Sequence, residues 1–252
     1  MSQNYLCLNC EKPTSGNFCN HCGQKTDTHR VTFKHFIFHD LLHGVWHIEK
    51  EILFTLKEAI TRPGNAALDY IKGKRIRYYN VFYLILLLIG LGVFIENIYL
   101  SSSLKYTSYL DNSFKEEEGS VVIDFIGRYV KFFLALAVPV FALNSYWLFN
   151  RKKLLYSEHL IIFGMFYLGI IFFTLIGNLL DFSEFVEPLA FISKWTNTLL
   201  PIILIVYLIK GFYNAFGSDY SKINCFLRIV LYIALIVVEL RILGQLLKAI
   251  LV

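Results

Sequence analysis

Five stretches of apolar residues limit what this chain can fold into, because each is close to the roughly 20 residues that an α-helix needs to cross a bilayer. They run over Val81–Leu100, about Tyr129–Phe149, Leu160–Leu180, Leu199–Phe216 and Phe226–Val252. Hydrophobic residues make up 56% of the chain, which is more than a soluble domain usually carries. The sequence therefore predicts an all-α integral membrane protein with about five transmembrane helices over residues 81–252.

The last stretch is interrupted by Glu239 and Arg241. Ionisable groups at membrane depth are costly unless they have a partner or face water. Two positions apart on a helix, these side chains point to nearly opposite sides and do not neutralise one another. Glu239 then needs either a structural polar contact, with Asn144 or Asn178 as candidates, or a role in a functional ion or substrate site. The segment is expected to span the membrane or to be re-entrant or interfacial.

The charges outside the apolar stretches indicate an orientation. Before the first stretch stand Lys72, Lys74, Arg75 and Arg77, and between the second and third stand Arg151, Lys152 and Lys153. Loops rich in lysine and arginine remain in the cytosol. The intervening links are acidic, with Glu116, Glu117, Glu118, Asp181, Glu184 and Glu187. We therefore expect a multi-pass protein with a cytosolic N-terminus, and no cleavable signal peptide precedes it.

The basic run Lys72–Arg77 is expected to contact anionic lipid headgroups, since tyrosines typical of the membrane interface follow it. The formal net charge of +5 follows from the cytosolic bias of the cations. Nucleic acid is for this reason a poor candidate partner.

Four cysteines near the N-terminus have the spacing of a metal site. Cys7, Cys10, Cys19 and Cys22 form the pattern C-x2-C-x8-C-x2-C. Each two-residue gap lets both sulfurs reach one ion, and four thiolates leave no open coordination position. Gly23 follows the second pair, where a positive φ is expected. The pattern predicts a zinc ribbon over residues 1–27, with one structural zinc per chain.

Disulfides are the alternative, because four cysteines in a secreted module look similar. The expected cytosolic location favours zinc, since that compartment keeps thiols reduced. Cys225 lies far from the ribbon and is expected to be a buried thiol.

The segment over residues 28–80 should contain amphipathic helices at the membrane, in the cytosol or in the headgroup layer. Between Thr32 and Arg62 one face carries apolar residues at helical spacing: Ile37, Leu41, Val45, Ile48, Ile52 and Leu56. The sequence Arg62-Pro63-Gly64 should end this helix. A second short helix is expected from Asn65 to Lys72, before Gly73.

The opposite face carries a histidine stripe, at His35, His39, His43 and His47. Neighbouring members lie one turn apart and could share a metal ion. The stripe drifts by about 40° per step, so all four histidines cannot bind the same ion. A polar surface that meets headgroups or the ribbon is the favoured interpretation, and a second metal site is the alternative.

Several motifs together resemble an uncharacterised bacterial family of multi-span membrane proteins, a domain of unknown function. They are Phe18-Cys-x-x-Cys-Gly-Gln24, Thr32-Phe-Lys-His35, Leu42-His-Gly-Val-Trp-His47, Thr61-Arg-Pro-Gly64 and Tyr70-Ile-x-Gly-Lys-Arg75. The resemblance covers the N-terminal third and implies a bacterial cytoplasmic membrane protein with zinc. It implies no reaction.

Two classes of function remain open. The first is a non-enzymatic membrane scaffold or regulator whose ribbon binds a cytosolic protein. The second is a transporter or membrane enzyme that uses Glu239, Arg241 and the histidine stripe. The sequence contains no nucleophile elbow or P-loop, and its spans show no evident inverted repeat. The scaffold is favoured, and a packed bundle rather than a polar cavity at Glu239 would support it.

Overall fold

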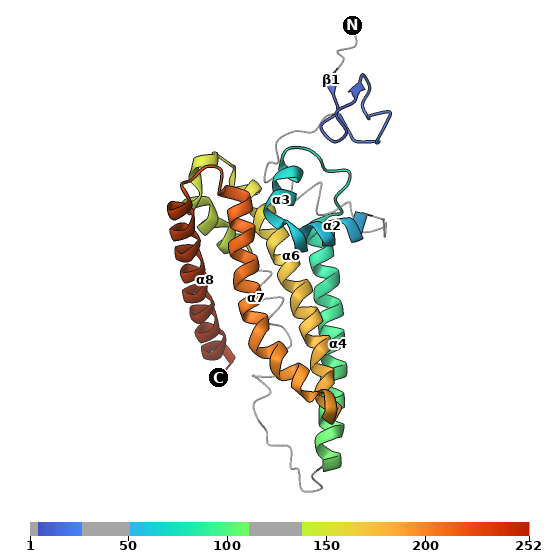
Figure 1. The fold of residues 1–252 in the computed structure, drawn as a ribbon, viewed down its shortest axis with the longest axis vertical. Coiled ribbons are helices and arrows are strands. Elements are labelled where there is room, and N and C mark those ends of the chain that lie inside the picture. Colours follow the sequence, from blue (N-terminus) through green and yellow to red (C-terminus); the bar gives the residue numbers. More distant parts are fainter. Residues whose placement is uncertain (1–4, 27–50, 111–137, 252) are drawn as a thin grey trace.

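The computed structural model describes residues 5–26, 51–110 and 138–251, and Figure 1 shows a small N-terminal lobe above a bundle of long helices. In this ribbon lobe (residues 5–26), strand β1 (Tyr5–Leu6) pairs antiparallel with strand β2 (Pro13–Thr14). A single bridge joins Phe18 to Lys25. Two short loops with so few backbone pairs need further interactions to hold them together.

Two short helices connect the ribbon lobe to the bundle. Helix α2 spans Glu51–Thr61 and α3 spans Pro63–Ile71. Proline begins α3 readily, because its missing N–H falls among the amides that have no partner in a first turn. Gly73 follows α3 with φ 98°, a conformation that L side chains rarely adopt. These bounds confirm the predicted helix end at Arg62–Gly64 and the second helix before Gly73.

The bundle contains four long helices and one helical segment that is described in part. They are α4 (Val81–Leu110), residues 138–148, α6 (Tyr156–Asp181), α7 (Ala190–Phe216) and α8 (Lys222–Leu251). Short 3-10 helices lie in the connections: η2 (Asn150–Lys152), η3 (Phe182–Phe185) and η4 (Glu187–Leu189). In Figure 1, α4 and α6 run away from the ribbon lobe, α7 returns towards it, and α8 runs away again.

Three helical segments are long and apolar enough to cross a membrane, namely Val81–Ser103, Tyr156–Phe185 and Glu187–Phe216. The structure thus supports a membrane protein, with three candidate spans where the sequence predicts about five. Of the other two predicted spans, the one from Tyr129 is described only from residue 138. The last coincides with α8, which is one continuous helix but carries Arg228, Glu239 and Arg241.

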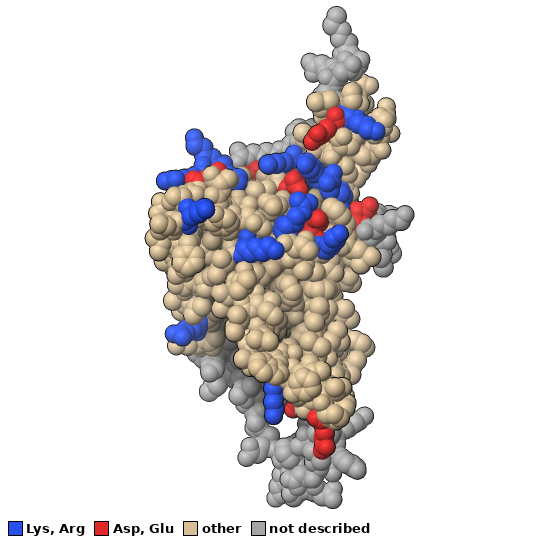
Figure 2. Space-filling view, in the orientation of Figure 1, with Lys and Arg blue, Asp and Glu red and all other residues tan. Residues whose placement is uncertain are grey.

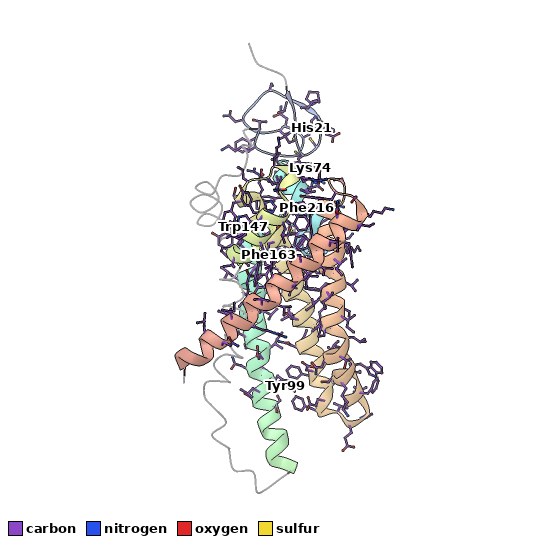
Figure 3. All side chains as sticks on the ribbon, turned by 90° about the vertical axis from the view of Figure 1, so that its left-hand side faces the viewer. His21, Lys74, Tyr99, Trp147, Phe163 and Phe216 are labelled. Atoms are coloured by element: carbon purple, nitrogen blue, oxygen red, sulfur yellow. The ribbon has the colours of Figure 1, made fainter. Side chains whose placement is uncertain are left out.

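Helix α6 is the centre of the bundle. In its apolar span 72% of the residues are buried, against 39% for α4 and 28% for α7. Aromatic rings fill the bundle at the ribbon end, where Phe149 stacks on Phe216 with centroids 4.5 Å apart and Phe212 lies 4.4 Å from Tyr232. All four side chains are fully buried, and Figure 3 shows Phe216 below the ribbon lobe. This end of the bundle is therefore a packed core.

Helices α2 and α3 are fixed to the bundle by close backbone approaches. A Cβ atom placed on Gly64 would lie 2.3 Å from the Gly211 carbonyl oxygen and 2.7 Å from the Ala215 nitrogen. The Tyr207 hydroxyl donates a hydrogen bond to the Ala59 carbonyl at 2.7 Å. Helix α7 therefore holds both short helices against the end of the bundle.

The charges of the described residues differ between the two ends of the bundle. Figure 2 shows lysine and arginine side chains gathered at the end next to the ribbon lobe. The basic loop between α3 and α4 (residues 72–80) and the link 149–155 both lie there. The connection between α6 and α7 lies at the other end, where the Tyr99 hydroxyl bonds the Glu184 carboxylate at 2.8 Å. The cations thus gather at one end and the acidic α6–α7 connection lies at the other, as the sequence predicts. The predicted acidic residues Glu116–Glu118 lie outside the described residues.

Candidate metal centre

The four clustered cysteines lie on two loops that repeat one backbone pattern. In each loop the N–H four residues after the first cysteine donates to that cysteine's carbonyl, from Glu11 to Cys7 and from Gly23 to Cys19, both at 2.8 Å. Glu11 and Gly23 have φ values of 61° and 72°. The positive φ predicted at Gly23 is confirmed, and Glu11 occupies the equivalent place without being glycine. The two loops thus present their cysteines in the same way.

The sulfur atoms converge on one point. The Sγ atoms of Cys7, Cys10, Cys19 and Cys22 all lie within 4.8 Å of one another, and all four residues are free thiols. The Cys7–Cys22 and Cys10–Cys19 sulfur pairs are each 3.6 Å apart. Sulfurs bound to one tetrahedral zinc by bonds of about 2.3 Å lie roughly 3.8 Å from each other. The cluster is therefore close enough to hold one metal ion, and four sulfurs in this geometry suit zinc or iron.

The surroundings of the cysteines favour thiolates unequally. Backbone hydrogen bonds lower the pKa of Cys19. Burial opposes ionisation of Cys22, but hydrogen bonds, first among them one from the Asn9 side chain, lower its pKa to about 6. A backbone hydrogen bond favours the Cys10 thiolate as well, yet burial and the neighbouring sulfurs raise the pKa of Cys10 to about 12. Because a divalent cation neutralises the crowded thiolates, metal binding here is coupled to proton release.

The second cysteine loop is docked on the basic loop. The Gln24 side chain is only 3% exposed and its Nε2 donates to the Gly73 carbonyl at 2.7 Å. Its Oε1 accepts a hydrogen bond from the Ile76 N–H at 3.0 Å. One side-chain amide thus satisfies a donor and an acceptor of the basic-loop backbone. In Figure 3 the ribbon lobe, marked by His21, lies directly above this loop at Lys74.

Arg77 connects the basic loop to the first cysteine loop. Its Nε donates to the Asn9 side-chain oxygen at 2.8 Å, and its Nη2 donates to the Asn9 carbonyl at 3.0 Å. The Asn9 side chain also hydrogen-bonds the Cys22 sulfur. Arg77, Asn9 and Cys22 therefore form a continuous polar chain from the start of the bundle to the cysteine cluster. Charge-assisted bonds of this kind are among the stronger hydrogen bonds in proteins.

The other three cations of the basic loop face different surroundings. Lys74 lies 3.6 Å from the Asp69 carboxylate, and Arg75 lies over the Tyr70 ring, 5.7 Å from its centroid. Lys72 is exposed at the end of α3. Lipid contact stays a prediction for the basic run, and the geometry leaves Lys72 as the member best placed for it.

A partly buried charge cluster lies where α2 meets α3. Arg62 forms an ion pair with Glu58 and lies 3.7 Å from Asp69. The hydrogen bond with Glu58 raises the pKa of Arg62 against the opposing effect of burial. Tyr78 is 6% exposed, and its hydroxyl has no hydrogen-bond partner among the described residues. Burial, with the nearby Asp69 and Glu58 carboxylates, raises the pKa of Tyr78. The cluster joins the two short helices.

Glu239 has one of the two partners expected for it. The Asn144 side-chain amide donates to both carboxylate oxygens of Glu239, at 2.8 and 2.9 Å. Arg241 is exposed on α8, on a different side from Glu239. The histidine stripe, His35, His39, His43 and His47, lies outside the described residues. The structure thus brings together the four cysteines but does not bring Glu239 and Arg241 into one site.

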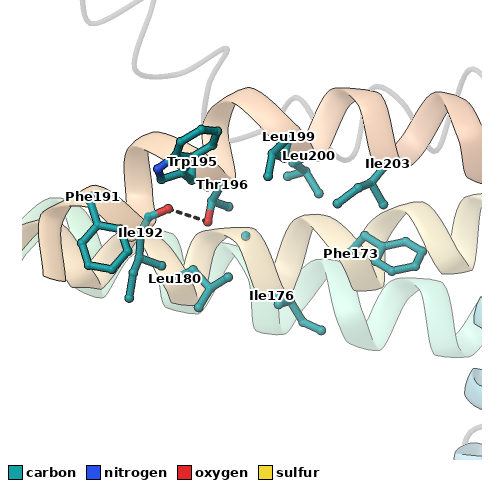
Figure 4. A pocket seen from close by; sticks show the side chains of 11 residues that line it. Phe173, Ile176, Leu180, Phe191, Ile192, Trp195, Thr196, Leu199, Leu200 and Ile203 are labelled. Atoms are coloured by element: carbon teal, nitrogen blue, oxygen red, sulfur yellow. Dashed lines mark hydrogen bonds between the residues drawn. The ribbon is translucent and has the colours of Figure 1, made fainter.

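Two hollows in the described part of the bundle lie apart from Glu239. One, of about 360 Å³, lies between α6 and α7 and is lined by apolar side chains such as Trp195 and Leu199. Figure 4 shows its Thr196 hydroxyl bonded within α7, to the Ile192 carbonyl at 2.9 Å. The other, of about 470 Å³, adjoins the link 149–155. Neither is lined by Glu239 or Arg241.

Sequence reasoning missed the residues that dock the ribbon lobe. Gln24 and Asn9 carry no signal for a contact with residues about 50 and 68 positions away. For Arg77 the sequence predicts lipid contact, because a basic run before an apolar stretch usually lies at the membrane surface.

Comparison with known proteins gives a local match. A family described as a protein of unknown function (DUF3667) matches residues 49–91. This range contains α2, α3, the basic loop and the start of α4, and includes the motifs Thr61–Gly64 and Tyr70–Arg75 that carry part of the expected resemblance. No curated protein and no solved structure matches the chain.

Proposed function

We propose that this protein is a scaffold or regulator in a bacterial cytoplasmic membrane, with one structural zinc in a cytosolic ribbon that binds a protein partner. The observation that carries the proposal is the fixed position of the ribbon lobe: Gln24 and Arg77 attach it to the end of the bundle. A module held in this way can present a surface at a constant distance from the membrane. The match to a family of unknown function supports no reaction.

The surface offered to the partner is apolar. Three large side chains of the ribbon lobe are exposed: Leu6 by 65%, Leu8 by 48% and Phe18 by 59%. Leu6 and Phe18 each precede the first cysteine of a loop, so the repeated loop pattern places them in equivalent positions. Contiguous exposed apolar side chains mark contact surfaces with other proteins, and we propose that these three side chains form one. We infer that a cytosolic protein covers them.

Photo-crosslinking in cells tests this surface. A crosslinking amino acid at Leu8 or Phe18 is expected to give the same protein adduct, and the adduct should disappear when Cys10→Ser removes the metal centre. Ser15, which is exposed on the same lobe, is the matched control site and should give none. Equal adducts at all three sites, or none at Leu8 and Phe18, would exclude an apolar partner surface.

A transporter or membrane enzyme is the alternative, with Glu239 as its ionisable group. The carboxylate is held by the Asn144 amide, and the hollows described above do not reach it. A purely structural contact needs a hydrogen bond rather than a charge, and glutamine keeps one of the two acceptor oxygens that the Asn144 amide contacts. We therefore expect Glu239→Gln to keep the melting temperature and any phenotype that deletion of the protein reveals.

Glu239→Lys should instead lower the melting temperature, because it places a cation beside Asn144 in an apolar segment. Arg241→Gln, at an exposed position on the same helix, is the control and should behave as the unmodified protein. Loss of the phenotype in Glu239→Gln, at unchanged expression and melting temperature, would favour transport or catalysis over the scaffold.

A further inference from the structure

Helix α4 has two faces whose residues recur with the same spacing. One face is buried and packs on α6, with Val81, Ile85, Leu88 and Ile95 as members. The opposite face, the outer seam, is exposed and consists of Leu87, Gly90, Phe94, Asn97 and Ser101. Residues spaced alternately three and four apart lie in one line along a helix, and a second helix can pack along such a line. The outer seam thus has the pattern of a helix–helix contact.

The outer seam lies at the edge of the bundle. In Figure 1, α4 borders the bundle on the side opposite to α8. Leu87 is 59% exposed and Phe94 is 63% exposed. Among the described residues, no side chain or neighbouring helix comes within 4 Å of a Cβ atom placed on Gly90. Because every member of the seam belongs to the candidate span Val81–Ser103, the seam faces either lipid or a further protein segment.

Asn97 makes the outer seam a poor surface for lipid. Its Nδ2 donates to the Val93 carbonyl of the same helix at 3.0 Å, and its side-chain oxygen accepts no hydrogen bond from the described residues. Acyl chains cannot supply the missing donor, and unsatisfied polar groups are costly in hydrocarbon. Between membrane helices, by contrast, asparagine side chains form hydrogen bonds. The amide therefore favours a second helix over lipid.

The composition of the seam suits a second copy of this chain. Two copies that insert with the same orientation are related by an axis along the membrane normal. Helix α4 then runs parallel to its counterpart, and each residue of the seam meets its own copy. Asn97 can pair with itself because its amide is both a donor and an acceptor. Gly90 allows the two helix backbones to approach closely.

Helix α8 has an exposed face that does not suit the same symmetry. Val230, Val237 and Arg241 lie along one line of this helix, and all three are exposed. In a parallel pair of α8 helices, Arg241 would meet the same residue of the other copy. Like charges repel strongly where the dielectric constant is low. The two exposed faces can therefore be compared directly by experiment.

We propose that the outer seam of α4 is the interface of a parallel homodimer of this protein in the membrane. Asn97 bonds Asn97 of the partner subunit, and Leu87 and Phe94 pack across the axis before and after Gly90. The interface places two ribbon lobes on the same side of the membrane. It does not depend on the proposed scaffold function.

Photo-crosslinking in membranes tests the interface. A crosslinking amino acid at Phe94 of the full-length protein is expected to give a covalent dimer in which the crosslinked peptide of each copy comes from α4. Val237, 44% exposed on the outer face of α8, is the matched control site and should give no dimer. Lipid adducts alone at Phe94, or equal dimer yields at the two sites, would exclude the α4 interface.

Dissociation of the purified dimer in detergent, measured by analytical ultracentrifugation, tests the roles of Asn97 and Gly90. Asn97→Leu should raise the dissociation constant about 3- to 30-fold, the range expected for a hydrogen bond between membrane helices. Asn97→Gln keeps a self-complementary amide and should stay close to the unmodified protein. Gly90→Leu should leave mostly monomer, because a bulky side chain stands where the two helices are closest.

A matched variant on α8 separates loss of the interface from loss of the fold. Ala234→Leu adds the same side chain at an exposed position of α8 and should leave the dimer intact. The Gly90→Leu monomer should keep the circular dichroism spectrum of the unmodified protein, since the space around Gly90 is open within one copy. Unchanged dissociation in both Asn97→Leu and Gly90→Leu, or an equal loss of dimer in Ala234→Leu, would overturn the proposal.

Discussion

Replacing Cys10 by serine is expected to reduce the metal content of the purified protein from one ion per chain to nearly none. Serine stays un-ionised near neutral pH, so the cluster loses one of four thiolate ligands within 4.8 Å of each other. Among the described residues of the ribbon lobe, the regular backbone pairing is limited to a two-residue strand pair and a single bridge. In domains this small, metal binding of about 10–16 kcal/mol supplies most of the folding free energy. Elemental analysis of freshly purified protein measures the loss.

Cys225→Ala is the matched control. Cys225 is fully buried in α8, far from the ribbon lobe in sequence, and its replacement should leave the metal content unchanged. The measurement should include zinc and iron, because both suit four sulfur ligands; we expect zinc. Metal retained at one ion per chain in Cys10→Ser would show that the ion is bound elsewhere.

Changing Gly64 to alanine is expected to destabilise the whole bundle. The new methyl group would lie 2.3 Å from the Gly211 carbonyl oxygen and 2.7 Å from the Ala215 nitrogen. Both are backbone atoms, so α3 and α7 must move apart. Overpacking costs up to about 3 kcal/mol, and more where backbone blocks relaxation. For a protein of this size that corresponds to a fall in melting temperature of roughly 6–12 °C, measurable by thermal unfolding in detergent.

Gly90→Ala, in α4, provides the comparison. No atom lies within 4 Å of a Cβ placed on Gly90, and alanine favours helix over glycine by about 1 kcal/mol. Its melting temperature should be unchanged or higher. If the Gly64→Ala and Gly90→Ala proteins have the same melting temperature, α3 and α7 do not approach each other as closely as described here.

The parts of this structure that sequence predicts depend on local patterns. The cysteine spacing places four sulfurs together because each pair needs only one tight loop. Pro63 and Gly73 set the helix boundaries because their backbone preferences are intrinsic. Apolar length indicates the spans, and it fails to fix their number where Glu239 and Arg241 interrupt the last helix.

The parts that sequence does not predict depend on contacts between distant segments. Arg77 stands in a basic run of the kind that contacts lipid, yet its guanidinium donates a hydrogen bond to Asn9, which lies 68 positions earlier in the chain. Gln24 is an unremarkable polar residue until its amide meets the basic-loop backbone. Such contacts depend on tertiary geometry, which one sequence without a template does not provide. The partner of Glu239 is an exception, because a half-buried carboxylate on an apolar helix has few polar side chains to choose from.

The docked ribbon lobe gives the metal centre a consequence beyond its own stability. Gln24 and Asn9 belong to the cysteine loops. Unfolding of these loops therefore breaks the hydrogen bonds that Gln24 forms with Gly73 and Ile76 and that Asn9 forms with Arg77. Loss of the metal should therefore weaken the part of the basic loop that the ribbon lobe contacts.

Amide hydrogen exchange at Ile76, measured with and without the metal, tests most directly whether the metal centre holds the ribbon to the bundle. The Ile76 N–H donates to Gln24, whereas the Tyr79 N–H of the same loop donates to the Thr55 hydroxyl at 2.7 Å and serves as an internal control. Removal of the metal by a chelator should speed exchange at Ile76 to the rate seen in Gln24→Ala and leave Tyr79 unchanged. Equal protection of Ile76 with and without metal would contradict this role of the metal centre.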